Sequence, residues 1–341
     1  MNLKRKKWIS IAAALLLAAV QLCACGSAAS GQNVETSSGN VNGSQQEPYR
    51  IIATIFPEYD WVMNVLGDNP AGVEVTLLLD KGVDLHSFQP SVDDIMKVTT
   101  CDMLIYAGGE SDDWVGDILK EAANQNMRQL NLIEILGDQA KTEELVEGME
   151  GHDHDHEHAD HDEEYDEHVW LSLRNAEIFV RKIAEELGGL DPENAGLYQE
   201  NAASYCADLK ALDEEYVRAV SEAEKKTLLF GDRFPFRYLT DDYGLEYYAA
   251  FAGCSAETEA SFETVAFLAQ KTDELGLGTV LTIDGSDRRI AETIISATKE
   301  KNQQILTMDS MQSATGKDAE PGSDYLSVMR SNLEVLKQAL Q

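Results

Sequence analysis

Short apolar runs alternate with helical patterns along most of this chain, and one long amphipathic stretch interrupts the alternation near the middle. Such alternation predicts parallel sheets whose strands are joined by crossover helices. The expected strands are Tyr49–Ile55, Val73–Leu79, Met103–Ala107, Thr227–Phe230, Tyr247–Phe251, Thr279–Ile283 and Ile305–Met308. We therefore expect an α/β fold with two lobes, each built on a mainly parallel sheet flanked by helices.

The interrupting stretch carries a single apolar stripe. Its apolar residues recur at helical spacing and are Ala195, Tyr198, Ala202, Tyr205, Leu209, Leu212, Tyr216 and Ala219. This spacing places them on one face of a helix that is longer than most helices in globular proteins. Asp191 offers an N-cap, and Pro192 suits the first helical position. We expect a rigid linker helix over 191–222, between an N-terminal lobe at 49–190 and a C-terminal lobe at 223–341.

Shorter helical patterns lie between the strands and at the end of the chain. The expected helices are Glu58–Leu66, Val92–Val98, Asp112–Asn124, Arg174–Leu187 and Tyr325–Leu340. The fourth should stop at Gly188-Gly189, because glycine commonly follows the last turn of a helix. Residues 137–167 have almost no apolar periodicity, which predicts an exposed loop.

The N-terminus has the layout of a secretory signal. A basic cluster at residues 4–7 precedes an apolar run over 9–22, which is too short to span a bilayer comfortably. Residues 22–26 resemble the lipobox of bacterial lipoproteins, in which the signal is removed just before a cysteine that becomes acylated. That cysteine would be Cys25, which leaves a signal peptide over 1–24. An ordinary signal peptide and an uncleaved anchor helix are the alternatives.

The segment after the signal is polar. Residues 25–48 are rich in Ser, Gly, Asn and Gln, so they cannot bury enough apolar surface to fold and should be a flexible tether. The formal net charge of the chain is −34, which makes nucleic acid an unsuitable partner and draws cations to the surface.

Cysteine is sparse beyond the lipobox. Cys101, Cys206 and Cys254 are the remaining cysteines, and none of them lies in a CxxC motif. Cys101 adjoins an apolar run, which favours a buried structural role over metal ligation. A disulfide between Cys206 and Cys254 is left open by the sequence.

Histidines point to metal binding. Five of the seven lie in the acidic loop 150–167, and they are His152, His154, His156, His158 and His161. Neutral imidazole is a good ligand for zinc, copper and nickel, and the neighbouring carboxylates add hard oxygen ligands. The tract is therefore expected to be a loose accessory chelator of no fixed geometry. The alternative is a solvated acidic loop with incidental histidines.

Other candidate ligands come after the expected strands. His86 comes after the strand that ends at Leu79, while Asp232, Asp284 and Asp309 each come directly after a strand of the second half. In open α/β sheets, ligands bind beyond the carboxyl ends of the strands. These side chains are therefore expected to meet in a cleft between the lobes, although an Asp after a strand is also a common helix cap or turn former.

Several segments resemble the zinc/manganese family of periplasmic or lipid-anchored substrate-binding proteins, solute-binding protein family 9. They are His86–Pro90, Tyr106–Gly109 with Trp114, Asp166–Leu171, Leu190–Asn194, Ile305–Ser310 and the closing helix 324–336. The resemblance covers essentially the whole chain from Tyr49. It implies that His86, His168 and Asp309 bind the metal, and that the lobes move little. A His-rich insertion between the first two ligands is typical of the zinc members.

The third family ligand is where this chain departs from the family. Family members usually have His, or sometimes Glu, three residues before an aromatic-x-Tyr, whereas Arg233 occupies that place here. Arginine cannot bind a cation. Asp232 could replace it, Asp284 or another acid could substitute, or three protein ligands could be completed by water. Asp232 is the favoured candidate.

The function expected is an extracytoplasmic, high-affinity zinc receptor that delivers metal to an ABC permease. It would be a monomer, held by lipid at Cys25 on the outer face of the bacterial cytoplasmic membrane, with Zn²⁺ as cargo and Mn²⁺ as the runner-up. A secreted metallohydrolase is the alternative from another class, but the chain has no HExxH motif. An adhesin role could coexist with transport.

Overall fold

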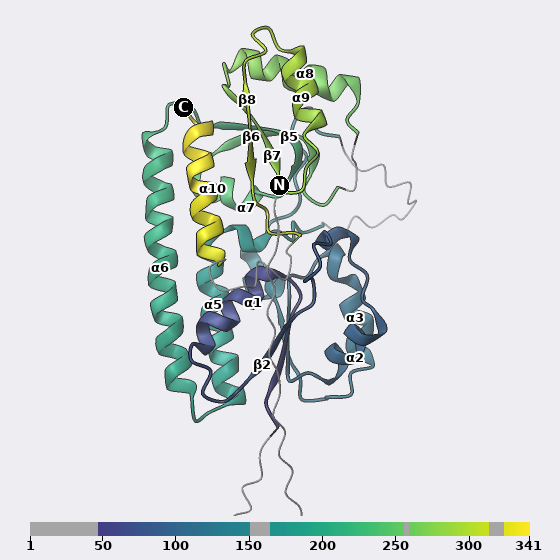
Figure 1. The fold of residues 1–341 in the computed structure, drawn as a ribbon, viewed down its shortest axis with the longest axis vertical. Coiled ribbons are helices and arrows are strands. Elements are labelled where there is room, and N and C mark those ends of the chain that lie inside the picture. Colours follow the sequence, from purple (N-terminus) through teal and green to yellow (C-terminus); the bar gives the residue numbers. More distant parts are fainter. Residues whose placement is uncertain (1–46, 151–163, 256–258, 314–323) are drawn as a thin grey trace, which may run out of the picture. The chain divides into compact units, whose positions relative to one another are not determined.

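Two parallel sheets form the framework of the residues that the structure describes, which are 47–150, 164–255, 259–313 and 324–341 (Figure 1). The structure is a computed structural model. The first sheet has the strand order β2-β1-β3-β4, and the second has the order β6-β5-β7-β8. All strand pairs within the two sheets are parallel. The expected α/β fold with two parallel-sheet lobes is confirmed.

The first lobe alternates strands and helices. Its strands are β1 (Arg50–Ala53), β2 (Glu74–Leu77), β3 (Met103–Tyr106) and β4 (Arg128–Asn131). Its helices are α1 (Phe56–Leu66), α2 (Val92–Thr100), α3 (Asp113–Lys120) and α4 (Leu132–Leu136), with 3₁₀ turns η1 (Leu85–Ser87), η2 (Glu110–Asp112), η3 (Gly137–Gln139) and η4 (Val169–Leu171). Every residue of β3 is buried, as expected for a central parallel strand covered on both faces. β4 and α4 were not expected from the sequence.

The second lobe repeats this alternation. Its strands are β5 (Thr227–Phe234), β6 (Glu246–Ala252), β7 (Thr279–Ile283) and β8 (Gln304–Met308). Its helices are α7 (Arg237–Tyr243), α8 (Phe262–Glu274), α9 (Arg289–Ala297) and α10 (Tyr325–Ala339). β5 is longer than expected, because it continues past an irregularity in its pairing with β6, between Phe230 and Arg233. Asp232 therefore lies within β5, and the expectation that it comes after the strand is wrong.

Two long helices run beside the sheets. They are α5 (Leu173–Leu190) and α6 (Ala195–Glu222), and α6 packs against α1, α5 and α10 (Figure 1). Tyr205 of α6 donates a 3.0 Å hydrogen bond to Asp60 in α1, while Tyr216 donates one of 2.6 Å to the carbonyl of Met329 in α10. α6 thus contacts elements of both lobes along its length.

The expected boundary between these helices is wrong in detail. α5 continues through Gly188 and Gly189 to Leu190, and Asp191 is its C-cap rather than the N-cap of α6. Gly188 packs closely against the start of α6, because a Cβ on it would lie 3.0 Å from Cβ of Ala195. The Asp191 carboxylate accepts hydrogen bonds from Asn194 and Tyr198, and so holds the turn into α6.

Side chains from both lobes share a core. The larger apolar cluster includes residues from β1 and α1 as well as from β5 and α10. The Trp170 indole donates a 2.9 Å hydrogen bond to the carbonyl of Ser310, and Tyr325 donates one of 2.6 Å to the carbonyl of Trp170. The Tyr325 ring meets Trp61 edge-on at 5.3 Å between centroids. These contacts join the first lobe to the end of β8 and the start of α10.

The cysteines outside the N-terminal segment are free thiols. Cys206 and Cys254 form no disulfide with each other. Cys101 is fully buried, as expected, and burial raises the pKa of its thiol to about 12. Among the residues that the structure describes, no helix is both long and apolar enough to cross a bilayer.

Candidate metal centre

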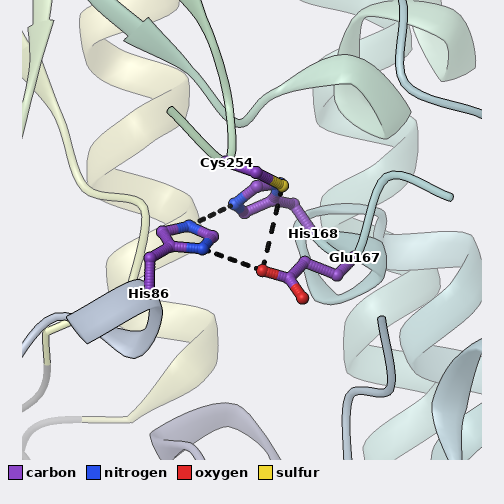
Figure 2. Close-up of side chains that lie close together, drawn as sticks. All are labelled: His86, Glu167, His168 and Cys254. Carbon is purple, nitrogen blue, oxygen red and sulfur yellow. Dashed lines mark hydrogen bonds and ion pairs between the residues drawn. The ribbon is translucent and has the colours of Figure 1, made fainter. Parts of the chain in front are cut away.

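Two histidines far apart in the sequence point their rings at each other (Figure 2). His86 lies in η1, and His168 directly precedes η4. Their Nε2 atoms are 3.3 Å apart. Two nitrogens that bind one tetrahedral zinc ion at about 2.0–2.1 Å would lie roughly 3.3 Å from each other. The spacing of the two nitrogens therefore suits a shared metal ion.

A carboxylate holds the other nitrogen of each ring. Asp166 Oδ1 is 2.8 Å from His168 Nδ1, and Glu167 Oε1 is 2.9 Å from His86 Nδ1. A carboxylate at Nδ1 fixes the proton there and leaves the Nε2 lone pair free for a metal. Adjacent residues of the chain thus orient both histidines. This also corrects the expectation that 137–167 is exposed throughout, because Asp166 and Glu167 are buried.

Burial and charge oppose each other at His168 and Glu167. Burial lowers the pKa of His168, but the charge and hydrogen bond of Asp166 raise that pKa by more, to a net value above the ordinary one. Burial raises the pKa of Glu167, but the His86 hydrogen bond and the charges of both histidines bring it below its usual value.

The Glu167 carboxylate is held from a second direction by the loop after β3. Ser111 donates its backbone N–H to Oε2 at 3.1 Å and its hydroxyl to Oε1. Gly109 lets the loop approach, since a Cβ on it would lie 2.8 Å from Oε2 and its φ of 81° also favours glycine. The loop around Gly108-Gly109 therefore positions the acid that orients His86.

Cys254 completes a cluster of four potential ligands. Its Sγ lies 3.8 Å from Glu167 Oε1, and ligand atoms of His86, Glu167, His168 and Cys254 lie within 4.8 Å of one another (Figure 2). Burial and the charges of nearby carboxylates raise the pKa of the Cys254 thiol, so it is protonated until a cation balances them. A metal ion would do so, because zinc-bound thiols are deprotonated.

The sequence reasoning missed Cys254 and Glu167 as members of this cluster. Cys254 lies two residues beyond the end of β6, so the strand-end rule that selected the aspartates also applied to it. Glu167 adjoins His168 in the sequence, but only the structure places its carboxylate against His86 rather than in solvent.

Comparison with known proteins agrees with this chemistry. Residues 51–339 match the family model described as zinc-uptake complex component A, periplasmic. The chain belongs to this family. The family resemblance inferred from the histidine and aspartate segments is thereby confirmed.

Relatives with curated names are similar over most of the chain. It is 27% identical over 348 residues to the high-affinity zinc uptake system protein ZnuA of Bacillus subtilis, covering 98% of each. It is 29% identical over 290 residues to the zinc-binding lipoprotein AdcA of Streptococcus pneumoniae, covering 84% of this chain. The chain spans about half the length of the AdcA relatives, 55%.

A solved structure shares the fold. The crystal structure of the Zn(II)-bound ZnuA-like domain of Streptococcus pneumoniae AdcA is 26% identical to this chain, with a TM-score of 0.67. The match covers 86% of this chain and 99% of that domain.

The aspartates predicted as ligands lie near the cluster but outside it. The carboxylate of Asp309 accepts the backbone N–H of Met311 at 2.8 Å, and that of Asp284 accepts the N–H and hydroxyl of Ser310. Asp232 lines a cavity of about 450 Å³ that His86 also lines. Asp309 and Asp232 as metal ligands stay predictions.

Arg233, at the expected position of the third family ligand, forms an ion pair. Its guanidinium bonds Asp84 Oδ2 at 2.6 Å, and the other oxygen of Asp84 accepts the backbone N–H of His86 at 3.1 Å. Burial raises the pKa of Asp84, but the hydrogen bond and charge of Arg233 lower this pKa by more, so that its net value lies below the usual one. Arg233 therefore pairs with an acid beside the cavity and supports the turn that carries His86.

The five histidines of the tract, His152, His154, His156, His158 and His161, lie outside the described residues, as does the lipobox residue Cys25.

Proposed function

We propose that this chain is an extracytoplasmic zinc receptor that delivers the metal to an ABC-type permease. The observation that carries the proposal is the pair of histidine Nε2 atoms, 3.3 Å apart with carboxylates behind them, in a cluster that also includes Cys254. Imidazole and thiolate ligands favour zinc over manganese, whose preferred ligands are carboxylate, carbonyl and water oxygens. Manganese is the runner-up cargo. The matched family of zinc-uptake components supports a receptor rather than an enzyme.

The proposed binding reaction is reversible coordination. Zn²⁺ takes the Nε2 lone pairs of neutral His86 and His168 and the thiolate of Cys254, and the thiol proton leaves to solvent. Asp309 and Asp232 are the proposed sources of an oxygen ligand. Acidification weakens binding, because protons compete for the imidazole and thiolate lone pairs.

The proposed domain arrangement rests on the sequence and the bounds of the elements. Residues 1–24 are the signal peptide, and 25–48 are a tether whose Cys25 carries the lipid, which is supported by the lipoprotein named among the relatives. The lobes are 49–190 and 223–341, joined by the segment 191–222, which contains the linker helix α6 (Ala195–Glu222). The histidines of the loop 150–167 bind metal loosely and raise its concentration near the centre.

Calorimetric titration of the mature protein with zinc and with manganese tests the proposal. We expect one tight zinc site whose affinity exceeds that for manganese by roughly a hundredfold or more, given its nitrogen and sulfur ligands. Deletion of residues 151–162 should leave that site intact. Equal affinity for manganese would reject the zinc assignment. Loss of the tight site on deletion would make the histidine tract the receptor.

Gly253 allows the end of β6 to approach His168. A Cβ at this position would lie 2.7 Å from Cε1 and 3.0 Å from Nδ1 of His168, as well as 3.0 Å from the carbonyl oxygen of Phe234. We therefore expect Gly253→Ala to displace the imidazole and weaken zinc binding by about 10–100-fold, the range seen when groups that orient ligands are changed. Competition with a chromophoric chelator measures this affinity.

Gly278→Ala is the matched control for this change. Gly278 is exposed, and apart from its own chain neighbours no atom of the described residues lies within 4 Å of the position of its Cβ. The zinc affinity of the Gly278→Ala variant should equal that of the wild type. Wild-type affinity in Gly253→Ala would show that the glycine is not needed to seat His168.

A further inference from the structure

The side-chain amide of Gln312 occupies the point between the two histidines. Its Nε2 lies 2.7 Å from His86 Nε2 and 2.5 Å from His168 Nε2. The side chain is almost fully buried, at 1% exposure. An amide NH₂ group has two hydrogens, so it can donate one to each histidine lone pair. The orientation fits the histidines, because carboxylates at both Nδ1 atoms make both Nε2 atoms acceptors.

The backbone around Gln312 aims it at this point. Gln312 lies beyond β8 in the second lobe, and its carbonyl accepts the backbone N–H of Leu85, the residue before His86, at 3.0 Å. Met311 has a φ of 58°, in the left-handed region that residues other than glycine rarely adopt. The Asp309 carboxylate accepts the N–H of Met311 and stabilises that turn. A turn with a left-handed residue at Met311, stabilised by Asp309, thus places the Gln312 side chain of the second lobe at the histidines of the first lobe.

Within the described part of the chain, only the nitrogen of the Gln312 amide has hydrogen-bond partners. Gln312 Oε1 is buried and finds no hydrogen-bond partner among the described residues. A buried carbonyl without a donor has lost its hydrogen bonds to water, and this cost offsets much of what the two N–H bonds contribute. The amide therefore fills the position with little net stabilisation, and a stronger competitor for the same lone pairs can displace it.

We propose that Gln312 is a displaceable plug, whose amide nitrogen competes with the metal ion for the Nε2 lone pairs of His86 and His168. This inference rests on the proposed zinc-receptor function. One lone pair cannot serve an amide hydrogen and a metal ion at once, so the ion enters only as Gln312 leaves. The plug keeps both rings aligned and their lone pairs satisfied until the metal arrives, and it lowers the apparent affinity to a value that permits release.

Gln312→Ala and Gln312→Leu test the plug. Both remove the N–H donors, and leucine keeps most of the side-chain volume should alanine impair folding. We expect the zinc dissociation constant to fall by about tenfold, or about 1.4 kcal/mol, and zinc association in stopped-flow mixing to become faster. The absorption spectrum of bound Co²⁺ should match that of the wild type, because the ligands are unchanged. Gln270→Leu, on the exposed face of α8, is the control and should change nothing.

The results that would reject the plug differ from the result that would reject the proposed function. Weaker binding together with an altered Co²⁺ spectrum would make Gln312 a ligand through its amide oxygen and overturn the plug. Unchanged affinity and association rate in both variants would also overturn it. Failure of the wild type itself to bind zinc tightly would reject the proposed function instead, and the same titration series reports it.

Discussion

His86→Ala combined with His168→Ala is expected to eliminate the tightest zinc site. Structural zinc sites bind with about 10–16 kcal/mol in total, so each of four ligands contributes roughly 3 kcal/mol, or about a hundredfold in affinity. Removing both imidazoles should therefore weaken binding by roughly ten thousandfold. The remaining groups, Glu167 and Cys254, cannot hold the ion alone. Competition against a series of chelators of graded affinity measures a change of this size.

Folding must be separated from ligation in this experiment. His168 is fully buried against Asp166, so its removal leaves a cavity and a carboxylate without its partner. His86 lines the cavity, and its removal leaves Glu167 still held by Ser111, so the single variant His86→Ala should lose less thermal stability without metal than His168→Ala, while losing about a hundredfold in affinity. A tight site that survives the double change would place the receptor elsewhere in the chain.

The sequence predicted the position of His86 for a physical reason. Apolar runs mark the strands, and the topology of parallel sheets brings residues after the strands to one edge, where His86 lies. His168 required the family pattern, because it comes after an acidic stretch without periodicity. The family pattern also named Asp309, whose carboxylate caps the turn that carries Gln312.

The features that the sequence did not predict depend on side-chain packing. The extension of β5 through Asp232 results from an irregular pairing with β6, which no local propensity encodes. α5 runs past Gly188-Gly189, because tertiary packing of the helix outweighs the intrinsic cost of two glycines. The contact between Glu167 and His86 joins residues 81 positions apart, so pattern reasoning within a window cannot detect it.

Arg233 is a cation beside the candidate metal centre. Its charge would repel a metal unless it were neutralised, and Asp84 pairs with it at 2.6 Å. The second lobe then needs another group to meet the histidines. Cys254 lies at the adjacent strand end, and the Arg233 guanidinium reaches the carbonyl of the next residue, Ser255, at 3.4 Å. Arg233 therefore links the supports of His86 and Cys254.

If Cys254 is the group of the second lobe that binds the metal together with the histidines, Cys254→Ser should lower zinc affinity by about a hundredfold or more. The reason is that the loss of one ligand costs roughly 3 kcal/mol. The preference for zinc over manganese should shrink as well, since a hydroxyl is a harder and weaker ligand than a thiolate. With Co²⁺ bound, the wild type should show a sulfur-to-metal charge-transfer band that the variant lacks. Titration with all three metals measures both effects.

Cys206→Ser provides the matched control for this loss. Cys206 is a buried free thiol of α6 whose sulfur lies 3.7 Å from the carbonyl oxygen of Glu177, away from the cluster. Its serine variant should retain wild-type zinc affinity, metal preference and the cobalt band, even if burial of a hydroxyl lowers its thermal stability. A Cys254→Ser protein that kept the band and the affinity would remove sulfur from the site. The centre would then depend on the two histidines and on oxygen ligands, and its preference would move toward manganese.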